Sequence, residues 1–394
     1  MKKKVLLRGP LLTRSGYGEQ ARFALRSLLS REDLFDIYIH PLNWGKTGWV
    51  YEDNEERTVI DHLIKKTIAF TQAGGQFDIS VQCTIPNEWE KVAPVNVGYT
   101  AGIETNRVAP DWILRCQHMV DRVIVVSEHS KAGFTDSIHH GTDTETGQPM
   151  TLQLAENYDI RAVGYPVKTF EELPEIEINV STEFNFLCVA QMGPRKNLQN
   201  TVKWFYEEFH DNPEVGLILK TNVARNCLMD RNRIRNDLRV TIKTHFPDAA
   251  CKLYLLHGDM TDEEMHSLYK HKAVNAFCML SHGEGFGLPY FEAAYSGLPI
   301  VAPGWSGHMD FLCDEQGNEH FYNVHYDVQT VPPEVVWENV IIPNSMWANP
   351  REKSAKKLLR QCYEDYSGEN KAENIAKSNA YAEQLKIRFS QENM

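Results

Sequence analysis

The sequence predicts an α/β protein of two doubly wound, Rossmann-like domains, each a parallel sheet covered by helices. First, a chain of 394 residues is longer than one hydrophobic core usually supports, so two domains are expected. Second, short apolar, β-branched runs alternate with longer helical patterns, which is typical of parallel sheets with helical crossovers. Third, an acidic stretch poor in core residues, 168–182, interrupts this alternation near the middle of the chain.

The first half supplies the strands and helices of one sheet. Runs of β-branched, aliphatic and aromatic residues predict strands at 5–7, 35–39, 79–83, 95–99 and 123–126. Apolar residues at helical spacing predict a helix over 17–29, and Pro110 and Asp111 mark the start of another over 112–119. We therefore place the N-terminal domain at residues 1–170.

The second half repeats the same alternation. Strands are predicted at 185–189, 215–219, 252–256, 276–280 and 300–302, with helices that include 201–209 and 262–271. This C-terminal domain spans residues 183–370, and we expect a last helix, about 375–394, to pack back on the N-terminal domain. Two such domains are expected to face each other across a cleft, because open α/β sheets bind ligands at the carboxyl ends of their strands.

Composition excludes an integral membrane protein and a disulfide-rich secreted one. No window approaches the roughly 18 to 20 apolar residues of a membrane span. The basic start is followed by an apolar run that Arg8, Pro10 and Arg14 interrupt, so it does not predict a signal peptide. The eight cysteines form no CxxC pair, which indicates reduced thiols and no structural zinc. We expect a cytoplasmic protein, in the host cytoplasm if a bacteriophage encodes it.

The distribution of charge along the sequence indicates one stretch that could bind a polyanion. A net charge of −12 argues against a protein whose whole surface binds nucleic acid. The stretch 225–243 nevertheless carries six cations, the densest positive run in the chain. Two interpretations stay open at this point, a solvated helix face and a local groove for phosphates.

The sharpest motif runs from Glu284 to Glu292, in the letters EGFGLPYFE. Gly285 and Gly287 let the backbone approach a ligand closely, and Leu288 begins a predicted helix whose free amides attract anions. A diphosphate suits that helix end, while the two carboxylates can accept hydrogen bonds from hydroxyl groups. The motif therefore predicts a site for a ligand that combines a diphosphate with hydroxyls.

At this motif the chain resembles the GT-B fold glycosyltransferases, in particular the large retaining group called family 4. The hallmark of that group is a pair of glutamates separated by seven residues in this same context. The resemblance implies that Glu284 contacts the donor sugar and Glu292 the ribose hydroxyls. It also implies that the backbone of Phe286, Gly287 and Leu288 contacts the donor diphosphate.

A second match follows the strand at 185–189, where VAQMGPRKN resembles the cationic segment of the same family. The family's lysine corresponds to Lys196, but its arginine falls on Gln191. Either Arg195 replaces the missing charge or Gln191 binds a phosphate oxygen as a neutral donor. Lys220, at the end of the next strand, is a further candidate, with an ordinary surface lysine as the alternative. A cation is needed because the leaving diphosphate gathers negative charge.

The N-terminal domain carries weaker matches. Gly16 and Gly18 follow the first strand and resemble the family's glycine-rich loop that faces the donor phosphates. Glu104 follows the strand at 95–99, where relatives place residues that touch the transferred sugar or the acceptor hydroxyl. A buried or capping carboxylate is the alternative for Glu104. The predicted catalytic set is thus Glu104, Lys196 and Glu284.

Four more side chains are candidates for a sugar or acceptor pocket, with core packing as the alternative: Trp44, Trp49, Trp305 and His308. No Asp-x-Asp motif is present, so we expect no required metal and no cofactor besides the donor. The expected donor is a UDP-sugar.

The acceptor stays open. Residues 8–28 and 85–105 resemble glycosyltransferases carried by tailed bacteriophages, which suggests hydroxymethylated pyrimidines in viral DNA as acceptor. The predicted phosphate contacts are then Arg231, Arg233, Arg235 and Arg239. The alternatives are a cell-surface glycan or lipid acceptor, which the acidic composition favours, and a non-catalytic nucleotide-sugar-binding protein.

Overall fold

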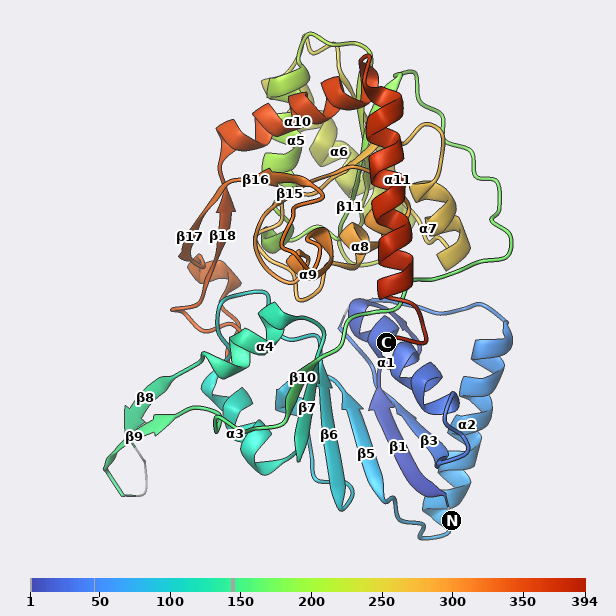
Figure 1. Cartoon of the computed structure of the whole chain (residues 1–394), viewed down its shortest axis with the longest axis vertical. Helices are drawn as coiled ribbons and strands as arrows, with labels where there is room; N and C mark the ends of the chain where they lie inside the picture. The colour runs from blue at the N-terminus through green and yellow to red at the C-terminus, as the bar shows by residue number, and fades with distance from the viewer. Residues whose placement is uncertain (1, 46, 143–145) are drawn as a thin grey trace. The chain divides into compact units, whose positions relative to one another are not determined.

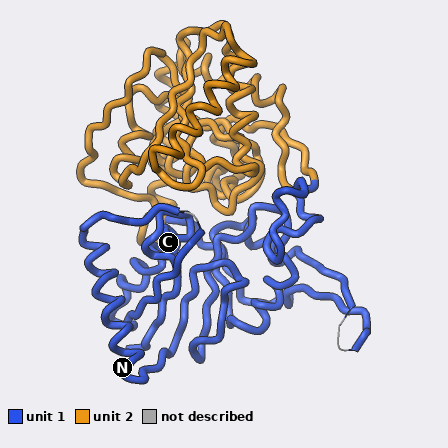
Figure 2. The backbone as a smooth tube through the Cα atoms, turned by 180° about the vertical axis from the view of Figure 1, so that it is seen from behind, with its two compact units in different colours: residues 1–165, 330–346 blue, residues 166–329, 347–394 orange. Residues whose placement is uncertain are grey.

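The computed structural model describes residues 2–45, 47–142 and 146–394, and its chain divides into two compact units (Figure 2). Unit 1 comprises residues 1–165 and 330–346, and unit 2 comprises residues 166–329 and 347–394. Each unit holds a six-stranded sheet in which the paired strands run parallel. The predicted pair of doubly wound α/β domains is therefore confirmed.

The sheet of unit 1 has the strand order β10-β7-β6-β5-β1-β3 (Figure 1). Its strands are β1 (Lys3–Gly9), β3 (Phe35–Pro41), β5 (Ile79–Cys83), β6 (Val95–Thr100), β7 (Arg122–Val125) and β10 (Ile160–Ala162). Its helices are α1 (Gly16–Leu29), α2 (Glu55–Gln72), α3 (Pro110–His118) and α4 (Glu128–Thr135). The five strands predicted in this half all form, because their apolar runs are long enough to be buried on both faces of a parallel sheet.

The sheet of unit 2 has the order β13-β12-β11-β14-β15-β16. Its strands are β11 (Phe184–Val189), β12 (Val215–Lys220), β13 (Lys252–Leu256), β14 (Ala276–Cys278), β15 (Ile300–Pro303) and β16 (Tyr322–Val324). Its helices are α5 (Leu198–Phe209), α6 (Leu228–His245), α7 (Asp262–Tyr269), α8 (Leu288–Tyr295), α9 (Met309–Leu312), α10 (Glu352–Ser367) and α11 (Lys371–Arg388). Aromatic side chains fill its core, with Phe186, Phe205 and Phe209 all buried within 6.3 Å of one another by ring centroid.

Short elements complete the chain. Strands β2 (Thr13–Arg14) and β4 (Gly48–Trp49) pair antiparallel, as do β8 (His139–Thr142) and β9 (Pro149–Leu152). Strands β17 (Tyr326–Thr330) and β18 (Met346–Pro350) form a further two-stranded sheet. Single 3₁₀ turns lie at Pro86–Glu88, Pro194–Lys196 and Pro333–Val335. None of these pairs is among the predicted strands, because strands of two to five residues carry little periodic signal.

The C-terminal helix is part of unit 2. Helix α11 packs against α8 and α10. The Tyr381 hydroxyl on α11 donates a 2.8 Å hydrogen bond to the Phe311 carbonyl, and Phe389 packs 5.1 Å from Phe291. The buried side chains at the end of α11 thus find their core within unit 2.

Residues 330–346 belong to unit 1 although they follow the strands of unit 2. The Asn106 amide donates to the Met346 carbonyl at 3.0 Å, and the Asn87 side chain donates to the Asn339 carbonyl at 3.0 Å.

In the described part of the chain, no helix combines the length and apolar character that a membrane crossing requires.

Candidate functional site

The loop between β14 and α8 is shaped by two glycines at close approaches. Gly287, the residue before α8, has φ 96°, a left-handed conformation that favours glycine. A Cβ on Gly307 would lie 1.9 Å from the Gly285 carbonyl oxygen, so the 305–308 segment can pack on this loop only without a side chain there. The glycine backbone therefore fixes the loop that presents Glu284.

Glu284 lies at the centre of an ion cluster. Lys196 Nζ donates to the two Glu284 carboxylate oxygens at 2.7 and 2.9 Å, and an Arg195 guanidinium nitrogen lies 2.9 Å from one of them. The Glu284 residue is only 5% exposed. Burial by itself raises a carboxyl pKa, but the charges of Arg195 and Lys196 outweigh it and lower the pKa of Glu284 to about 2. The carboxylate is therefore ionised and held in one orientation.

Acid should weaken the fold through this group. A carboxyl whose folded pKa is lowered stabilises the protein above its ordinary pKa of 4.5, and that stability is lost as the pH falls toward 2. We expect Glu284→Gln to reduce the loss of unfolding free energy between pH 5 and pH 3 by roughly 2 kcal/mol relative to wild type. Urea titrations at both pH values measure this, with exposed Glu364→Gln on α10 as the control. An identical acid dependence in wild type and Glu284→Gln would contradict the assignment.

The cations come from the turn after β11. Residues Pro194–Lys196 form a 3₁₀ turn, and Asn197 follows in the left-handed conformation with φ 52°. The buried Asn197 side chain donates a 2.9 Å hydrogen bond to the Leu280 carbonyl, which ties this turn to the end of β14. Sequence reasoning does not single out Asn197, although an asparagine before a helix is a signal for a left-handed residue.

The side chains of Gln191 and Lys220 donate hydrogen bonds to backbone carbonyls rather than to Glu284. The Gln191 side-chain amide donates to the Val223 carbonyl at 2.8 Å, and Lys220 Nζ donates to the Gly258 carbonyl. Of the two candidates for the family's missing arginine, Arg195 is thus the one that lies beside Lys196 and Glu284. The geometry favours Arg195 as the second cation of this cluster.

Helix α8 begins at Leu288 and carries Glu292 one turn in, where the residue is half-buried. Burial raises the pKa of the Tyr269 hydroxyl, and the charge of Glu292 raises it further, so the carboxylate lies near that ring. The Phe286 side chain is buried against Phe291 and Phe311, with ring centroids 5.2 and 4.9 Å away. The Phe286 side chain therefore anchors the loop.

His308 also anchors the loop. Its Nε2 lies 2.7 Å from the Pro303 carbonyl, so this nitrogen carries a proton and donates it. Burial lowers the pKa of His308, and its ring packs 4.5 Å from Tyr290. Core packing is thus the better interpretation for His308, whereas Trp305 is half-exposed.

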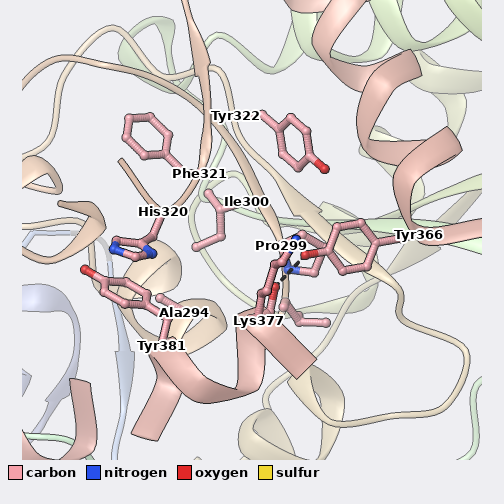
Figure 3. A pocket seen from close by; sticks show the side chains of 11 residues that line it. Ala294, Pro299, Ile300, His320, Phe321, Tyr322, Tyr366, Lys377 and Tyr381 are labelled. Atoms are coloured by element: carbon pink, nitrogen blue, oxygen red, sulfur yellow. Dashed lines mark hydrogen bonds between the residues drawn. The ribbon is translucent and has the colours of Figure 1, made fainter. Parts of the chain in front are cut away.

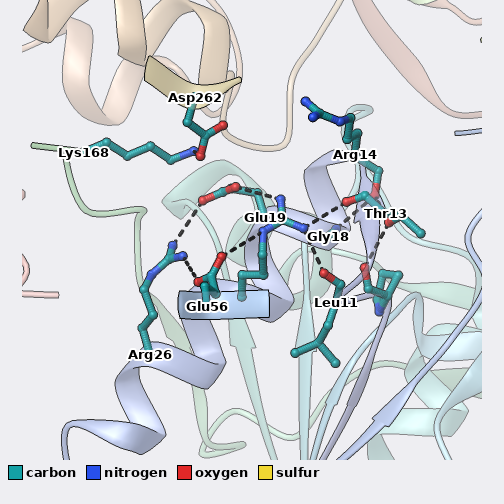
Figure 4. A network of polar contacts seen from close by, with 12 residues as sticks. Leu11, Thr13, Arg14, Gly18, Glu19, Arg26, Glu56, Lys168 and Asp262 are labelled. Carbon is teal, nitrogen blue, oxygen red and sulfur yellow. Dashed lines mark hydrogen bonds and ion pairs between the residues drawn. The ribbon is translucent and has the colours of Figure 1, made fainter. Parts of the chain in front are cut away.

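In unit 1 the glycine-rich loop is rigidly held at the start of α1 (Figure 4). A Cβ on Gly18 would lie 2.1 Å from the Thr13 carbonyl oxygen, whereas Gly16 is exposed and has open space around it. Arg22 donates 3.0 Å hydrogen bonds to the Leu11 and Thr13 carbonyls. The network continues through three more side chains: Glu19, Arg26 and Glu56.

Glu104 follows the end of β6, which contacts that loop. The Tyr17 hydroxyl and the Thr100 hydroxyl are 2.7 Å apart, which joins the glycine-rich loop to the end of β6. Burial raises the pKa of Tyr17, and the charge of Glu104 contributes to the rise. Within unit 1, the Tyr17–Thr100 contact thus joins the Gly16–Gly18 turn to the end of β6, and Glu104 follows four positions after Thr100.

The four arginines predicted to contact DNA lie on α6, and all are exposed: Arg231, Arg233, Arg235 and Arg239. Spacings of four residues place Arg231, Arg235 and Arg239 along one side of the helix, whereas Arg233 points elsewhere and lies 3.9 Å from Asp237. The four therefore do not form one surface. The exposed aliphatic residues Leu228 and Met229 share this helix.

A separate cavity of about 190 Å³ lies at the amino ends of β15 and β16 (Figure 3). Apolar residues and tyrosines line it together with Lys377, and His320 stacks on Tyr381 with ring centroids 3.7 Å apart. The Glu284 loop instead follows the carboxyl end of β14, and none of the predicted site residues lines this cavity. Across residues 2–45, 47–142 and 146–394, no cluster of three or more His, Cys, Asp or Glu side chains is placed to hold a metal ion.

Comparison with solved structures identifies the fold of the chain. The chain has the GT-B fold, and it superposes on the Anabaena protein HepE in complex with UDP-glucose with a TM-score of 0.56 and 14% identity, over 99% of this chain and 96% of that one. It superposes on sucrose-phosphate synthase from Thermosynechococcus elongatus with a TM-score of 0.57 and 12% identity, over 99% and 96% of the two chains. At these identities the likeness concerns the fold.

Sequence comparison adds a family match over part of unit 2. Residues 251–330 match the family model of glycosyl transferases group 1, a segment that contains Glu284 and Glu292. The serotype-specific mannosyltransferase WbdA of Escherichia coli is 26% identical over 204 residues, which cover 49% of this chain and 22% of the relative. The matched region thus spans about a fifth of the length of this curated relative.

Proposed function

We propose that the chain is a glycosyltransferase that moves a sugar from a nucleoside diphosphate donor to an acceptor hydroxyl. The observation that carries this proposal is the cluster of Glu284, Lys196 and Arg195 beside the start of α8. Two cations against one carboxylate leave a net positive charge, and the free amides of α8 add to it. A diphosphate is the ligand that this combination suits, and the match of residues 251–330 to glycosyl transferases group 1 supports it.

In the proposed reaction, Glu284 orients the donor sugar and Glu292 holds the ribose hydroxyls. Lys196, Arg195 and the backbone from Phe286 to Leu288 stabilise the charge that develops on the departing diphosphate. Glu104, Gly16 and Gly18 are the contributions proposed for unit 1. We expect Gln191 and Lys220 to contribute less to binding of the nucleotide sugar, because both side chains are hydrogen-bonded to carbonyls outside the cluster.

We propose retention of the anomeric configuration, with the acceptor hydroxyl attacking on the face that the diphosphate leaves. This path needs no covalent nucleophile on the protein. Proton NMR of the first product formed reads the configuration directly, since the anomeric coupling constant or chemical shift distinguishes the two outcomes.

The donor proposed is a UDP-sugar, and the acceptor proposed is a saccharide. HepE was solved with UDP-glucose, and the WbdA relatives are named mannosyltransferases, which supports testing UDP-glucose and nucleotide-activated mannose first. A panel of labelled nucleotide sugars, offered to simple glycans, hydroxymethylated DNA and water, tests the proposal. Binding of a donor without transfer to any acceptor or to water would favour the alternative of a non-catalytic nucleotide-sugar-binding protein.

Duplex DNA with hydroxymethylated pyrimidines is the second candidate acceptor, and the exposed arginines of α6 are the observation that favours it. If DNA binds there, the logarithm of affinity should fall with the logarithm of salt concentration by about 0.9 per phosphate contact. The double variant Arg235→Ala, Arg239→Ala should then flatten the slope by about two units, because both side chains lie on one side of α6.

Arg233→Ala supplies the matched control, since Arg233 points away from that side and should leave most of the slope unchanged. Filter binding between 50 and 200 mM salt measures the three proteins. An equal slope in wild type and the double variant would remove α6 from the interface. Failure of every donor to label modified DNA would remove this acceptor.

A further inference from the structure

His282 lies two positions before Glu284, in the loop that follows β14, and its backbone contacts Arg195. The His282 amide donates a 2.8 Å hydrogen bond to the Arg195 carbonyl. At the other end of the same arginine, a guanidinium nitrogen donates to the Gly283 carbonyl at 2.7 Å and to the Glu284 carboxylate at 2.9 Å. Residues 282–284 therefore hold both the backbone and the side chain of Arg195.

The ring of His282 is held in turn by two residues of β18, Trp347 and Ala348 (Figure 1). Its Nδ1 lies 2.7 Å from the Ala348 carbonyl oxygen, so this nitrogen carries a proton and donates it. The Ala348 amide donates to the His282 carbonyl at 3.0 Å. The imidazole also stacks on the indole of Trp347, with ring centroids 4.5 Å apart and ring planes 13° apart. Two hydrogen bonds and a stacked ring thus join His282 to β18.

Strand β18 is a rigid support for this ring. Trp347 is 3% exposed and Ala348 is completely buried. The strand pairs with β17, and directly after it the Arg351 amide donates to the His325 carbonyl at 2.8 Å. An indole packed on all sides cannot turn away from its neighbour, so it keeps the imidazole in one orientation.

The charge state of His282 suits a residue beside a cation. Burial lowers the pKa of the imidazole and the positive charge of Arg195 lowers it as well, while the hydrogen bond to Ala348 acts in the opposite direction. The net lowering of the pKa keeps the ring neutral at neutral pH, so the ring does not repel the guanidinium. A neutral imidazole donates from one nitrogen only, and the contact with Ala348 uses that proton.

We propose that His282 is a positioning residue of the donor site, which acts through Arg195 and does not itself touch the nucleotide sugar. An arginine side chain has several rotatable bonds, and fixing them before the donor binds removes an ordering cost from the reaction. His282 links β18 to Arg195 through its own amide and through the adjoining Gly283 carbonyl. This inference rests on the proposed function, in which Arg195 stabilises the leaving diphosphate.

The competing interpretation is that His282 only packs, as an anchor between the loop and β18. The two interpretations differ in what depends on Arg195. A packing residue affects the protein equally whatever side chain stands at position 195. A positioning residue affects turnover only while the arginine is present, so the effects of the two substitutions should not add.

A double-mutant cycle on kcat separates the two interpretations. We expect His282→Phe, which keeps a stacked ring but has no Nδ1 donor, to lower kcat about tenfold, the loss typical of removing one hydrogen bond. His282→Asn, whose side-chain amide can still donate to the Ala348 carbonyl, should retain most of the wild-type kcat. In an Arg195→Ala background, His282→Phe should change kcat by less than about twofold, because the group that it positions is absent.

His320→Phe is the matched control, because His320 also belongs to unit 2 and stacks on an aromatic ring, that of Tyr381, with centroids 3.7 Å apart. It should leave kcat unchanged. Thermal unfolding checks that each variant is folded, and calorimetry checks that the affinity of His282→Phe for the nucleotide sugar changes less than its kcat.

A second measurement does not depend on turnover. NMR titration of the full chain gives the pKa of the His282 imidazole in wild type and in Arg195→Ala. The variant should have the higher pKa, because it lacks the neighbouring positive charge that lowers the pKa in wild type.

Three results would overturn the proposal: an unchanged kcat in folded His282→Phe, an equal loss of kcat with and without Arg195, or the same His282 pKa in wild type and Arg195→Ala. Failure of the proposed function has a different signature. In that case wild type neither binds nor turns over any nucleotide sugar, although the pKa of His282 still responds to Arg195→Ala.

Discussion

Lys196→Ala should lower kcat by roughly 10²- to 10³-fold, the loss typical of removing one group that stabilises developing negative charge. The affinity for the donor should change much less, because the charge that Lys196 meets grows between the bound donor and the transition state. Steady-state kinetics with the best donor, combined with calorimetric donor binding, separate the two effects. Arg195→Ala should lower kcat in the same direction, since Arg195 lies beside Lys196 in the same cluster.

The control for Lys196 is Lys203→Ala on α5, where the lysine is half exposed and lies 3.7 Å from Glu207. It should leave kcat unchanged. Because Lys196 neutralises the buried Glu284, the variant also needs a folding check by thermal unfolding. If a folded Lys196→Ala enzyme showed a raised KM and an unaltered kcat, the proposed stabilisation of the leaving group would be refuted.

Glu292→Ala should weaken donor binding about ten- to a hundredfold, equivalent to about 1.5 to 3 kcal/mol for hydrogen bonds to a charged acceptor. The physical reason is the proposed contact between its carboxylate and the two ribose hydroxyls. Isothermal titration with UDP and with a UDP-sugar measures the change, and both ligands should lose affinity by a similar factor because both contain the ribose.

A 2′-deoxy donor provides the sharper comparison for Glu292. Wild type should bind deoxy-UDP more weakly than UDP, while Glu292→Ala should discriminate little between them. Exposed Glu364→Ala on α10 is the control for a change in overall charge. Wild-type donor affinity in Glu292→Ala would end the ribose assignment.

The sequence predicts the two sheets well because buried parallel strands are continuous apolar runs. The strands from Val95 and Ile300 both form where these runs occur, and α8 begins at the predicted Leu288. The ion cluster around Glu284 is only partly predictable. The motifs mark Lys196 and Glu284, but the choice of Arg195 over Gln191 depends on the 3₁₀ turn at Pro194–Lys196 and its left-handed Asn197.

Contacts between residues far apart in the sequence cannot be predicted from local sequence patterns. Residues 330–346 rejoin unit 1 through hydrogen bonds to Asn87 and Asn106, more than 200 positions away in sequence. Helix α11 contacts the rest of unit 2 through Tyr381 and through Phe389 at its end. The apolar spacing along this helix does not indicate which side chains it will contact.

The most direct test of the central claim is release of nucleoside diphosphate from a panel of nucleotide sugars, compared between wild type and the double variant Lys196→Ala, Glu292→Ala. The proposed function predicts release by wild type from at least one donor, accelerated by a saccharide acceptor. The double variant should retain roughly 1% of that rate or less, since it loses both leaving-group and ribose contacts. Equal release by both proteins, or no binding and no release with any donor, would contradict it.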